Sequence, residues 1–397
     1  MRRKPESAFK RAGFTLLSLL FAFLSLLLLA ALAVYLHPGA GEPAAYTLQS
    51  TDLGARLNNS LSNSKAEALS GIATIRKHYA IPEDALSAPA PNPAGFGRLS
   101  IDQADQLLPV IEQARRSGLL EGQDVIFDPN AEFYHDSFIG YYYDETILMI
   151  VWKEVVNGTT CSCCEVKIAD ASQFRRKITE DRLGSPVWVY ASELAKAVNP
   201  VIAMNADFYM FRDFGVVVYQ RQLWRMDEGT YTGSYKKYNC VDTCFIDSGG
   251  DFHFTHMMEE RSRAEMQQYI DENDILFSIS FGPVLVENGE LKHCEWYPAG
   301  EPDIGYSRAA IGQVDHLHYY YMSSNHAPER DSLWTVDDMA RAMYERGVPN
   351  AYGLDGGQTS EILFQGEPFN HIDYGAERGV SDIIYFASAI PESEVRS

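Results

Sequence analysis

The pattern of apolar and polar residues divides the chain into three parts, and the first is a long apolar stretch. Between Gly13 and Leu36 no charged side chain occurs. A helix of that length spans about 36 Å, enough to cross the ~30 Å hydrocarbon core of a membrane. We therefore predict that residues 1–36 form a cytoplasmic basic tip and a transmembrane signal-anchor. The competing interpretation is a cleaved signal peptide, with small residues at Ala31-Leu32-Ala33, but a signal usually has a shorter apolar stretch.

The second part, residues 37–124, is predicted to be a linker and a helical stalk. Apolar residues recur at helical spacing in residues 53–75, and a proline-rich connection follows. Ser100 is the expected N-cap of a further helix that ends near Gly118. Amphipathic helices of this kind pack on each other, so self-association through the stalk is expected.

The third part, residues 125–397, changes to short β-branched and aromatic runs. A helix is expected at residues 192–197, and a capping box from Thr335 to Asp338 opens another that ends at Gly347. The sequence therefore predicts an α+β domain of mostly antiparallel or mixed β-sheet with flanking helices. Strands are expected at residues 138–143, 146–156, 166–169, 201–204, 215–219, 275–286 and 309–322.

The distribution of charge predicts where the protein is located and argues against nucleic acid as a partner. The 397 residues include 54 acidic and 33 basic side chains, a formal net charge of −21, which argues against binding of nucleic acid. The first 36 residues run against this trend, with five basic side chains against Glu6 alone. Basic flanks stay in the cytoplasm, so we expect a single-pass protein of the cell membrane with an extracytoplasmic C-terminal domain.

Two polar segments follow apolar runs in a way that suggests a site. In residues 203–212 an apolar strand leads directly into Asn205 and Asp207, and then into aromatics and Arg212. In residues 352–360 two glycines, Thr and Ser follow Asp355, and exposed N–H and hydroxyl groups of this kind suit an oxyanion. The spacing of a P-loop is absent. Each segment alone is also compatible with an ordinary turn.

The order of several motifs resembles the phosphodiester glycosidase family over about residues 125–390. That family includes the enzyme that uncovers mannose 6-phosphate and bacterial exopolysaccharide-associated proteins. The segments that carry the resemblance are Ala169–Arg175, Asn205–Tyr209, Phe281-Gly282-Pro283, Ser307–Gly312, Tyr352–Ser360 and Glu377–Asp382.

The chain departs from the family pattern at three places. Ala206 replaces a usual Gly, and the aromatics that follow are exchanged. Gln358-Thr359-Ser360-Glu361 stands where Gly-Ser-Ser-Thr is common, and residues 323–326 occupy the region of a frequent Asp-Gly-Arg segment.

The resemblance implies hydrolysis of a sugar 1-phosphodiester in a glycan of the envelope or exopolysaccharide. An oxocarbenium-like transition state needs a carboxylate, and the phosphate leaving group needs a cation. The expected catalytic residues are Asp207, Asp355 and Arg308. No cofactor or metal is expected. The expected substrate-binding residues are Asn205, Tyr209, Arg212, Gly356, Gly357, Thr359 and Ser360.

Other functions stay open at this stage. The same fold could serve as a non-catalytic glycan-binding or exopolysaccharide-assembly factor, or as a scaffold that recruits partners through its stalk. Six cysteines on the exported side favour disulfides or partly free thiols over a zinc site built from Cys161, Cys164, Cys240 and Cys244. The pairs His316/His318 and His253/His256 are interpreted as ordinary polar positions rather than metal ligands.

Overall fold

The computed structural model describes residues 79–391 and 394, with gaps at residues 121, 213, 227–240, 258, 260, 299 and 325–332. Within this described part of the chain, no helix is both long enough and apolar enough to span a membrane. The predicted transmembrane helix over residues 13–36 and the stalk helix over residues 53–75 lie outside the described residues.

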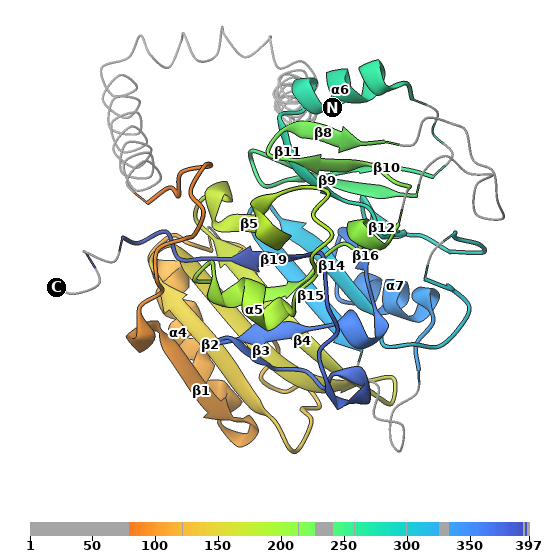
Figure 1. The fold of residues 1–397 in the computed structure, drawn as a ribbon. Coiled ribbons are helices and arrows are strands. Elements are labelled where there is room, and N and C mark those ends of the chain that lie inside the picture. Colours follow the sequence, from red (N-terminus) through yellow and green to blue (C-terminus); the bar gives the residue numbers. More distant parts are fainter. Residues whose placement is uncertain are drawn as a thin grey trace, which may run out of the picture. The chain divides into compact units, whose positions relative to one another are not determined.

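The largest sheet of the described chain has nine strands, and every neighbouring pair in it is antiparallel (Figure 1). β3 and β4 form its longest hairpin, and the burial of nearly all their side chains shows that both faces of the sheet are covered. In spatial order the strands are β1 (Phe96–Ser100), β2 (Phe138–Asp144), β3 (Ile147–Val156), β4 (Thr159–Ile168), β15 (His318–Ser324), β14 (Ala309–Asp315), β16 (Asn350–Leu354), β12 (Val284–Glu287) and β13 (Glu290–Leu291).

A five-stranded antiparallel sheet packs on one face of the large sheet. Its order is β18 (Glu367–Pro368), β17 (Ile362–Phe364), β6 (Ile202–Asn205), β19 (Asp382–Phe386) and β5 (Phe174–Ile178). Two smaller sheets complete the β-structure of the described residues. They are β10 (Phe252–Thr255), β9 (Thr243–Asp247) and β11 (Ile275–Ile279), and the pair β7 (Val217–Tyr219) and β8 (Gln222–Arg225).

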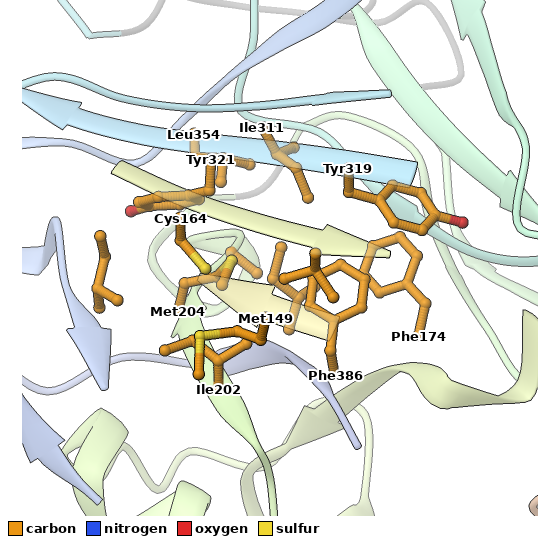
Figure 2. Close-up of a cluster of buried hydrophobic side chains, with 14 of the residues drawn as sticks. Met149, Cys164, Phe174, Ile202, Met204, Ile311, Tyr319, Tyr321, Leu354 and Phe386 are labelled. Carbon is orange, nitrogen blue, oxygen red and sulfur yellow. The ribbon is translucent and has the colours of Figure 1, made fainter. Parts of the chain in front are cut away.

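Apolar side chains from both large sheets meet in one core (Figure 2). Met149, Cys164 and Ile311 point inward from the nine-stranded sheet, and Met204 and Phe386 point back from the five-stranded sheet. The outer faces are covered by helices: α4 (Leu108–Arg116) and α7 (Val336–Glu345) pack on the large sheet, and α5 (Ala191–Lys196) packs on the small one. A further helix, α6 (Arg263–Glu272), packs near β9 and β11. This mostly antiparallel α+β architecture agrees with the predicted class.

Local sequence signals are confirmed most clearly at α7. The Thr335 side chain accepts from the Asp338 N–H, and the Asp338 side chain caps the Thr335 N–H, as a capping box requires. Gly347 follows the helix with a φ of 72°, the conformation that glycine adopts at low cost. The hairpin of β2 and β3 and the central strand β6 also lie where the sequence predicts them.

Two predicted strands are each a pair of strands, and a third is longer than expected. Residues 275–286 contain β11 and β12, which belong to different sheets. Residues 309–322 contain most of the hairpin of β14 and β15, and Leu317 in its turn has a φ of 57°. The strand predicted at residues 166–169 is the end of β4, which begins at Thr159.

Residues 96–116 pack on the nine-stranded sheet, which corrects their assignment to a separate stalk. β1 pairs with β2, and Ile111 and Ala114 of α4 enter the core cluster on the outer face of that sheet. Ser100 precedes a 3₁₀ helix, η3 (Ile101–Leu107), and makes no side-chain cap hydrogen bond.

The chain enters the fold through a set of contacts that we call the Arg175 grip. Arg175 lies on β5, and its guanidinium donates hydrogen bonds to three backbone carbonyls of the entering segment. These are the carbonyls of Pro82 at 3.2 Å, Glu83 at 3.3 Å and Ala85 at 2.6 Å. The grip fixes residues 82–85 against the edge strand of the five-stranded sheet.

Candidate functional site

Three strand ends meet at Asn205, the last residue of β6. Its Nδ2 donates to the carbonyl of Asp355, just after β16, at 2.6 Å. Its Oδ1 accepts from the Glu361 N–H at 3.1 Å, just before β17, and from the Tyr321 hydroxyl at 2.7 Å. Asn205 is buried, and both its Nδ2 and its Oδ1 are hydrogen-bonded to these segments. The residue predicted to bind substrate therefore positions Asp355.

Asp355 is the half-buried carboxyl at this junction. Burial raises its pKa to about 6, and the nearby charge of Asp207 adds to the rise. Hydrogen bonds from Thr359 and from the Gly356 N–H oppose the rise, as does the charge of Arg378. The carboxyl therefore titrates near neutrality, where a carboxyl group can serve as a catalytic acid or base.

The segment after Asp355 is held close to the backbone of Ser307, two residues before β14 begins. The Gly357 N–H donates to the carbonyl of Ser307 at 2.7 Å, and Gly357 has a φ of 60°. Thr359 and Ser360 are buried, and the Ser360 hydroxyl hydrogen-bonds the Ser323 hydroxyl at 2.6 Å. Within this predicted segment, Gly356 and Gly357 stay half-exposed beside Asp355.

Gly356→Ala is expected to destabilise the protein by about 1–3 kcal/mol, a typical cost of overpacking. A Cβ at position 356 would lie 2.6 Å from the Ser307 carbonyl oxygen, which is backbone and cannot rotate away. Urea unfolding of the full-length protein measures the change. Unfolding at the wild-type urea concentration would contradict this close packing.

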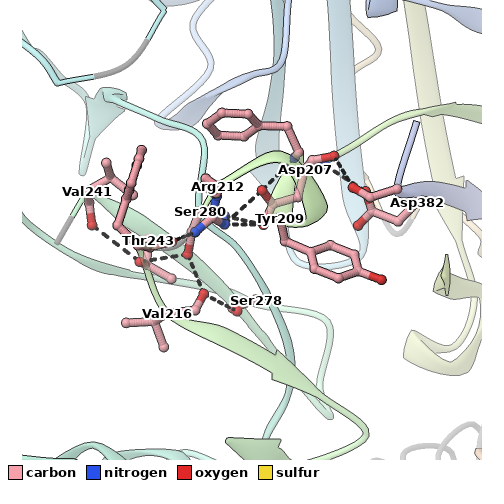
Figure 3. A network of polar contacts seen from close by, with 12 residues as sticks. Asp207, Tyr209, Arg212, Val216, Val241, Thr243, Ser278, Ser280 and Asp382 are labelled. Atoms are coloured by element: carbon pink, nitrogen blue, oxygen red, sulfur yellow. Dashed lines mark hydrogen bonds and ion pairs between the residues drawn. The ribbon is translucent and has the colours of Figure 1, made fainter. Parts of the chain in front are cut away.

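Asp207 lies at the centre of a buried ionic network (Figure 3). Its carboxylate accepts from Arg212 Nη2 at 2.8 and 2.9 Å and from the Ser280 N–H at 3.0 Å, and its side chain is 0% exposed. Its backbone N–H donates to Asp382, which Arg176 binds at 2.5 Å. Burial alone would raise the pKa of Asp207, but the two arginines outweigh it and lower the pKa.

Tyr209 and Arg212, both predicted to bind substrate, are also placed inside the protein. Tyr209 is fully buried and packs against Ile178 and Val217, with the Arg176 guanidinium carbon 5.5 Å from the centre of its ring. Arg212 is buried between the rings of Phe208 and Phe214 while it binds Asp207. Neither side chain presents a polar group to solvent at Asp355.

The Arg308 guanidinium, predicted to hold phosphate, is committed to the backbone of a neighbouring loop. Arg308 is buried, and its nitrogens donate to the carbonyls of Gly300 at 2.6 Å, Glu301 at 2.8 Å, Ile304 at 2.5 Å and Trp334 at 3.1 Å. Burial lowers its pKa. The geometry makes Arg308 an anchor of residues 300–304.

The exposed cation near Asp355 is Arg378, which was not among the residues predicted from the sequence to form the site. Its side chain is exposed, and its charge reaches Asp355. Exposed aromatic rings lie close by, because Trp188, 55% exposed, covers the backbone of Gly379. Tyr374 is 91% exposed. The sequence could have drawn attention to Arg378, because it lies within the Glu377–Asp382 segment that carries the family resemblance.

The cysteines and histidines do not assemble a metal site in the described part of the chain. No group of three His, Cys, Asp or Glu side chains there could hold a metal ion. Cys163, Cys164, Cys244 and Cys294 carry free thiols, and Cys240 lies outside the described residues. His316 belongs to the turn after β14, whereas His318 is buried on β15 against Glu165 at 2.7 Å.

A cavity of about 300 Å³ beside β5 is a less suitable site. Its lining includes Arg175, Lys177 and Tyr219. The charged groups that line it already have partners, because Arg175 forms the Arg175 grip and Lys177 pairs with Asp181. We therefore place the candidate site at Asp355, a titratable carboxyl that the charge of the exposed Arg378 reaches.

The candidate site lies within a segment that matches a known family model. Residues 199–387 match the phosphodiester glycosidase family model. This match confirms the resemblance and supports a hydrolase of that type. It begins just before β6 and includes Asn205, Asp207, Arg308, Asp355 and Arg378.

Individual relatives of the phosphodiester glycosidase segment are distant. An uncharacterized SPbeta prophage-derived protein of Bacillus subtilis, YomE, is 25% identical over 272 residues, which cover 66% of this chain and 38% of that relative. The zebrafish N-acetylglucosamine-1-phosphodiester alpha-N-acetylglucosaminidase catalytic domain, auto-inhibited by its pro-peptide, has 14% identity and a TM-score of 0.48. That alignment covers 65% of this chain and 86% of the zebrafish chain. A hypothetical protein from Synechocystis has 13% identity and a TM-score of 0.42, with 61% and 62% covered.

Proposed function

We propose that this protein hydrolyses a sugar 1-phosphodiester, releasing a sugar and a phosphomonoester. The observation that carries the proposal is the position of Asp355, a half-buried carboxyl at the junction that Asn205 forms inside the matched segment, with a pKa of about 6 and within reach of the charge of the exposed Arg378. The proposed setting is an envelope or exopolysaccharide glycan, reached by an extracytoplasmic domain that the predicted anchor over residues 13–36 holds at the membrane.

In the proposed reaction, ionised Asp355 acts at the anomeric carbon, either as the nucleophile or as the base that activates water. The departing phosphate is already a weak base, so it needs charge stabilisation more than protonation. The Arg378 guanidinium suits that role through its paired N–H donors. Asp207 and Arg308 take structural roles in this proposal, because their charged groups are buried and bonded to protein.

Aromatic side chains support a carbohydrate substrate. Binding sites for small molecules combine aromatic surface with a few placed polar groups. Trp188 and Tyr374 supply exposed rings near Arg378 and near the loop of Gly357, respectively. Half-buried Gly357, whose Cβ position meets no heavy atom within 4 Å, leaves room close to Asp355 for a sugar hydroxyl or a phosphate oxygen.

Arg378→Gln is expected to lower kcat/KM for a chromogenic sugar 1-phosphodiester by about 10–100-fold, the value of one or two lost hydrogen bonds to a charged group. The matched control is Arg341→Gln on the exposed face of α7, which should leave kcat/KM unchanged. Equal activity of the two variants would remove Arg378 from the site.

The alternative function is glycan binding without turnover in the same site. It predicts that the full-length protein retains phosphoglycan on a binding assay while releasing no product from any member of a sugar-phosphodiester panel. Measured turnover that disappears in Asp355→Asn would exclude this alternative.

A further inference from the structure

Tyr374 is an exposed aromatic residue held in a strained backbone conformation near the candidate site. It lies at the tip of a short turn after Asp373, with a φ of 63° and a ψ of 8°. This left-handed region is costly for a bulky side chain and is usually occupied by glycine. The ring packs against very little of the protein, because the residue is 91% exposed. Backbone strain that brings no packing is typical of residues that contact ligands.

The turn that carries this ring is tied at both ends to the candidate site. Before the tip, the Asp373 carboxylate accepts from the Ser307 hydroxyl at 2.8 Å. The backbone carbonyl of Ser307 in turn accepts from the Gly357 N–H at 2.7 Å. After the tip, the Gln358 side-chain amide donates to the Ala376 carbonyl at 2.9 Å. These three hydrogen bonds fix the turn against the loop that follows the candidate carboxyl.

A second aromatic ring flanks the same loop. Tyr306 directly precedes Ser307 and is 38% exposed. Its hydroxyl donates to Glu301 Oε2 at 2.5 Å, and the Arg308 guanidinium carbon lies 5.3 Å from the centre of its ring. Because Arg308 is itself bonded to backbone carbonyls, the ring of Tyr306 is held in place before any ligand arrives. A ring held in this way loses little conformational entropy on binding.

The chemistry of this surface suits a sugar. The C–H groups on one face of a sugar ring pack on an aromatic ring, while the sugar hydroxyls need hydrogen-bonding groups at its edge. Tyr306 and Tyr374 provide the rings. The exposed carboxylate of Glu301 and the exposed hydroxyl end of Tyr374 provide polar groups beside them.

We propose that Tyr374 and Tyr306 form an aromatic subsite that binds a further sugar ring of the substrate, so that the substrate is an oligosaccharide or a polysaccharide rather than a single sugar phosphodiester. The inference rests on the proposed function in one respect, the place of the cleaved bond at Asp355. The sugar that is cleaved occupies the loop after Asp355. The two tyrosines flank that loop, so the next sugar of the glycan contacts their rings.

The first test is affinity electrophoresis of the full-length protein in gels that contain dextran, a soluble mannan or glycol chitin. At least one polysaccharide should retard the wild type, and Tyr374→Ala should bind it about 3–10-fold more weakly, the value of one aromatic contact. Tyr306→Leu, which keeps apolar bulk beside Arg308 without a flat ring, should be weakened similarly. Tyr374→Phe keeps the ring and should bind like the wild type.

The matched control is Tyr344→Ala on α7, where the tyrosine is 46% exposed, and it should bind like the wild type. Equal binding by Tyr374→Ala and the wild type would overturn the subsite. So would a wild type that none of the three polysaccharides retards.

A stability measurement separates binding from folding. Asn adopts the left-handed region more readily than Tyr, so Tyr374→Asn should be at least as stable as the wild type in urea. Its folding constant should rise by up to about fivefold, while its binding of glycan should be as weak as that of Tyr374→Ala. A loss of stability in Tyr374→Asn would show that the strained tyrosine serves the fold, which contradicts the proposal.

Kinetics show whether the subsite serves the reaction. Two chromogenic phosphodiesters are compared, one of a single sugar and one of the matching trisaccharide, both made from the sugar of a polysaccharide that binds. Tyr374→Ala should lower the ratio of kcat/KM for the trisaccharide to that for the single sugar by about 3–10-fold. If glycan binding depends on Tyr374 but neither ester is hydrolysed, the subsite stands and the proposed function fails. If both esters are hydrolysed and that ratio does not change, the proposed function stands and the subsite fails.

Discussion

Replacing Asp355 with Asn is expected to lower kcat on a sugar 1-phosphodiester by about 10³-fold, within the range that a positioned acid–base group contributes. The amide is nearly the same size, so the hydrogen bonds of the loop can persist while the charge is lost. Steady-state kinetics of the full-length protein measure the effect. The control is Asp315→Asn at the exposed end of β14, which should keep wild-type kcat.

The pH profile gives an independent check on Asp355. Because the carboxyl must be ionised to act, kcat/KM should fall about tenfold per pH unit below its pKa of about 6. Asp207 contributes to that raised pKa through its charge, so Asp207→Asn should move the acid limb to lower pH. An acid limb near pH 4, the ordinary value for Asp, would show that Asp355 is not the titrating group.

Asp207→Asn should reduce the free energy of unfolding by about 3–5 kcal/mol, the usual cost of removing one partner from a buried ion pair. The reason is that Arg212 stays buried with its main acceptor neutralised, while Arg176 also loses a nearby charge. Urea unfolding measures the change. A variant with full stability and no activity would reverse our assignment and return Asp207 to a catalytic role.

A double variant tests whether the lost stability comes from this network. Combining Asp207→Asn with Arg212→Met removes both members of the pair, so the double variant should lose less than the sum of the two single variants. Contacting residues commonly show coupling of about 0.5–3 kcal/mol in such a cycle. Strict additivity would mean that the two side chains do not depend on each other.

Secondary structure was predicted most accurately from the sequence where it depends on interactions between residues close together in the chain. The capping box at Thr335 and the apolar spacing after it determine α7 without reference to the rest of the fold. The hairpin of β14 and β15 escaped prediction because its turn contains no Gly or Pro, and Leu317 takes a positive φ there. The same limit applies to residues 96–100, whose pairing with β2 depends on residues 38 to 46 positions away.

The sequence predicted that the segments after β6 and β16 meet, but it did not predict the contacts that their charged residues make. Polar residues after β6 and β16 do meet at one junction, as the order of motifs implies. Pattern alone does not show whether an arginine points to solvent or to backbone, so Arg308 and Arg378 could not be distinguished before the fold was known. Glu361 is similar, because only its burial in the folded protein distinguishes it from an ordinary surface glutamate.

The Arg175 grip determines how a mechanical load would enter this protein. Tension applied through the chain before residue 81 would reach Ser172 and β5 first, through the Ile81 N–H that the Ser172 hydroxyl accepts and the three carbonyls that Arg175 holds. β5 pairs with β19 at the edge of the five-stranded sheet, whereas β16, which leads to Asp355, lies inside the other sheet. A pull from the N-terminal side would therefore peel an outer strand before it strained the loop that carries Asp355.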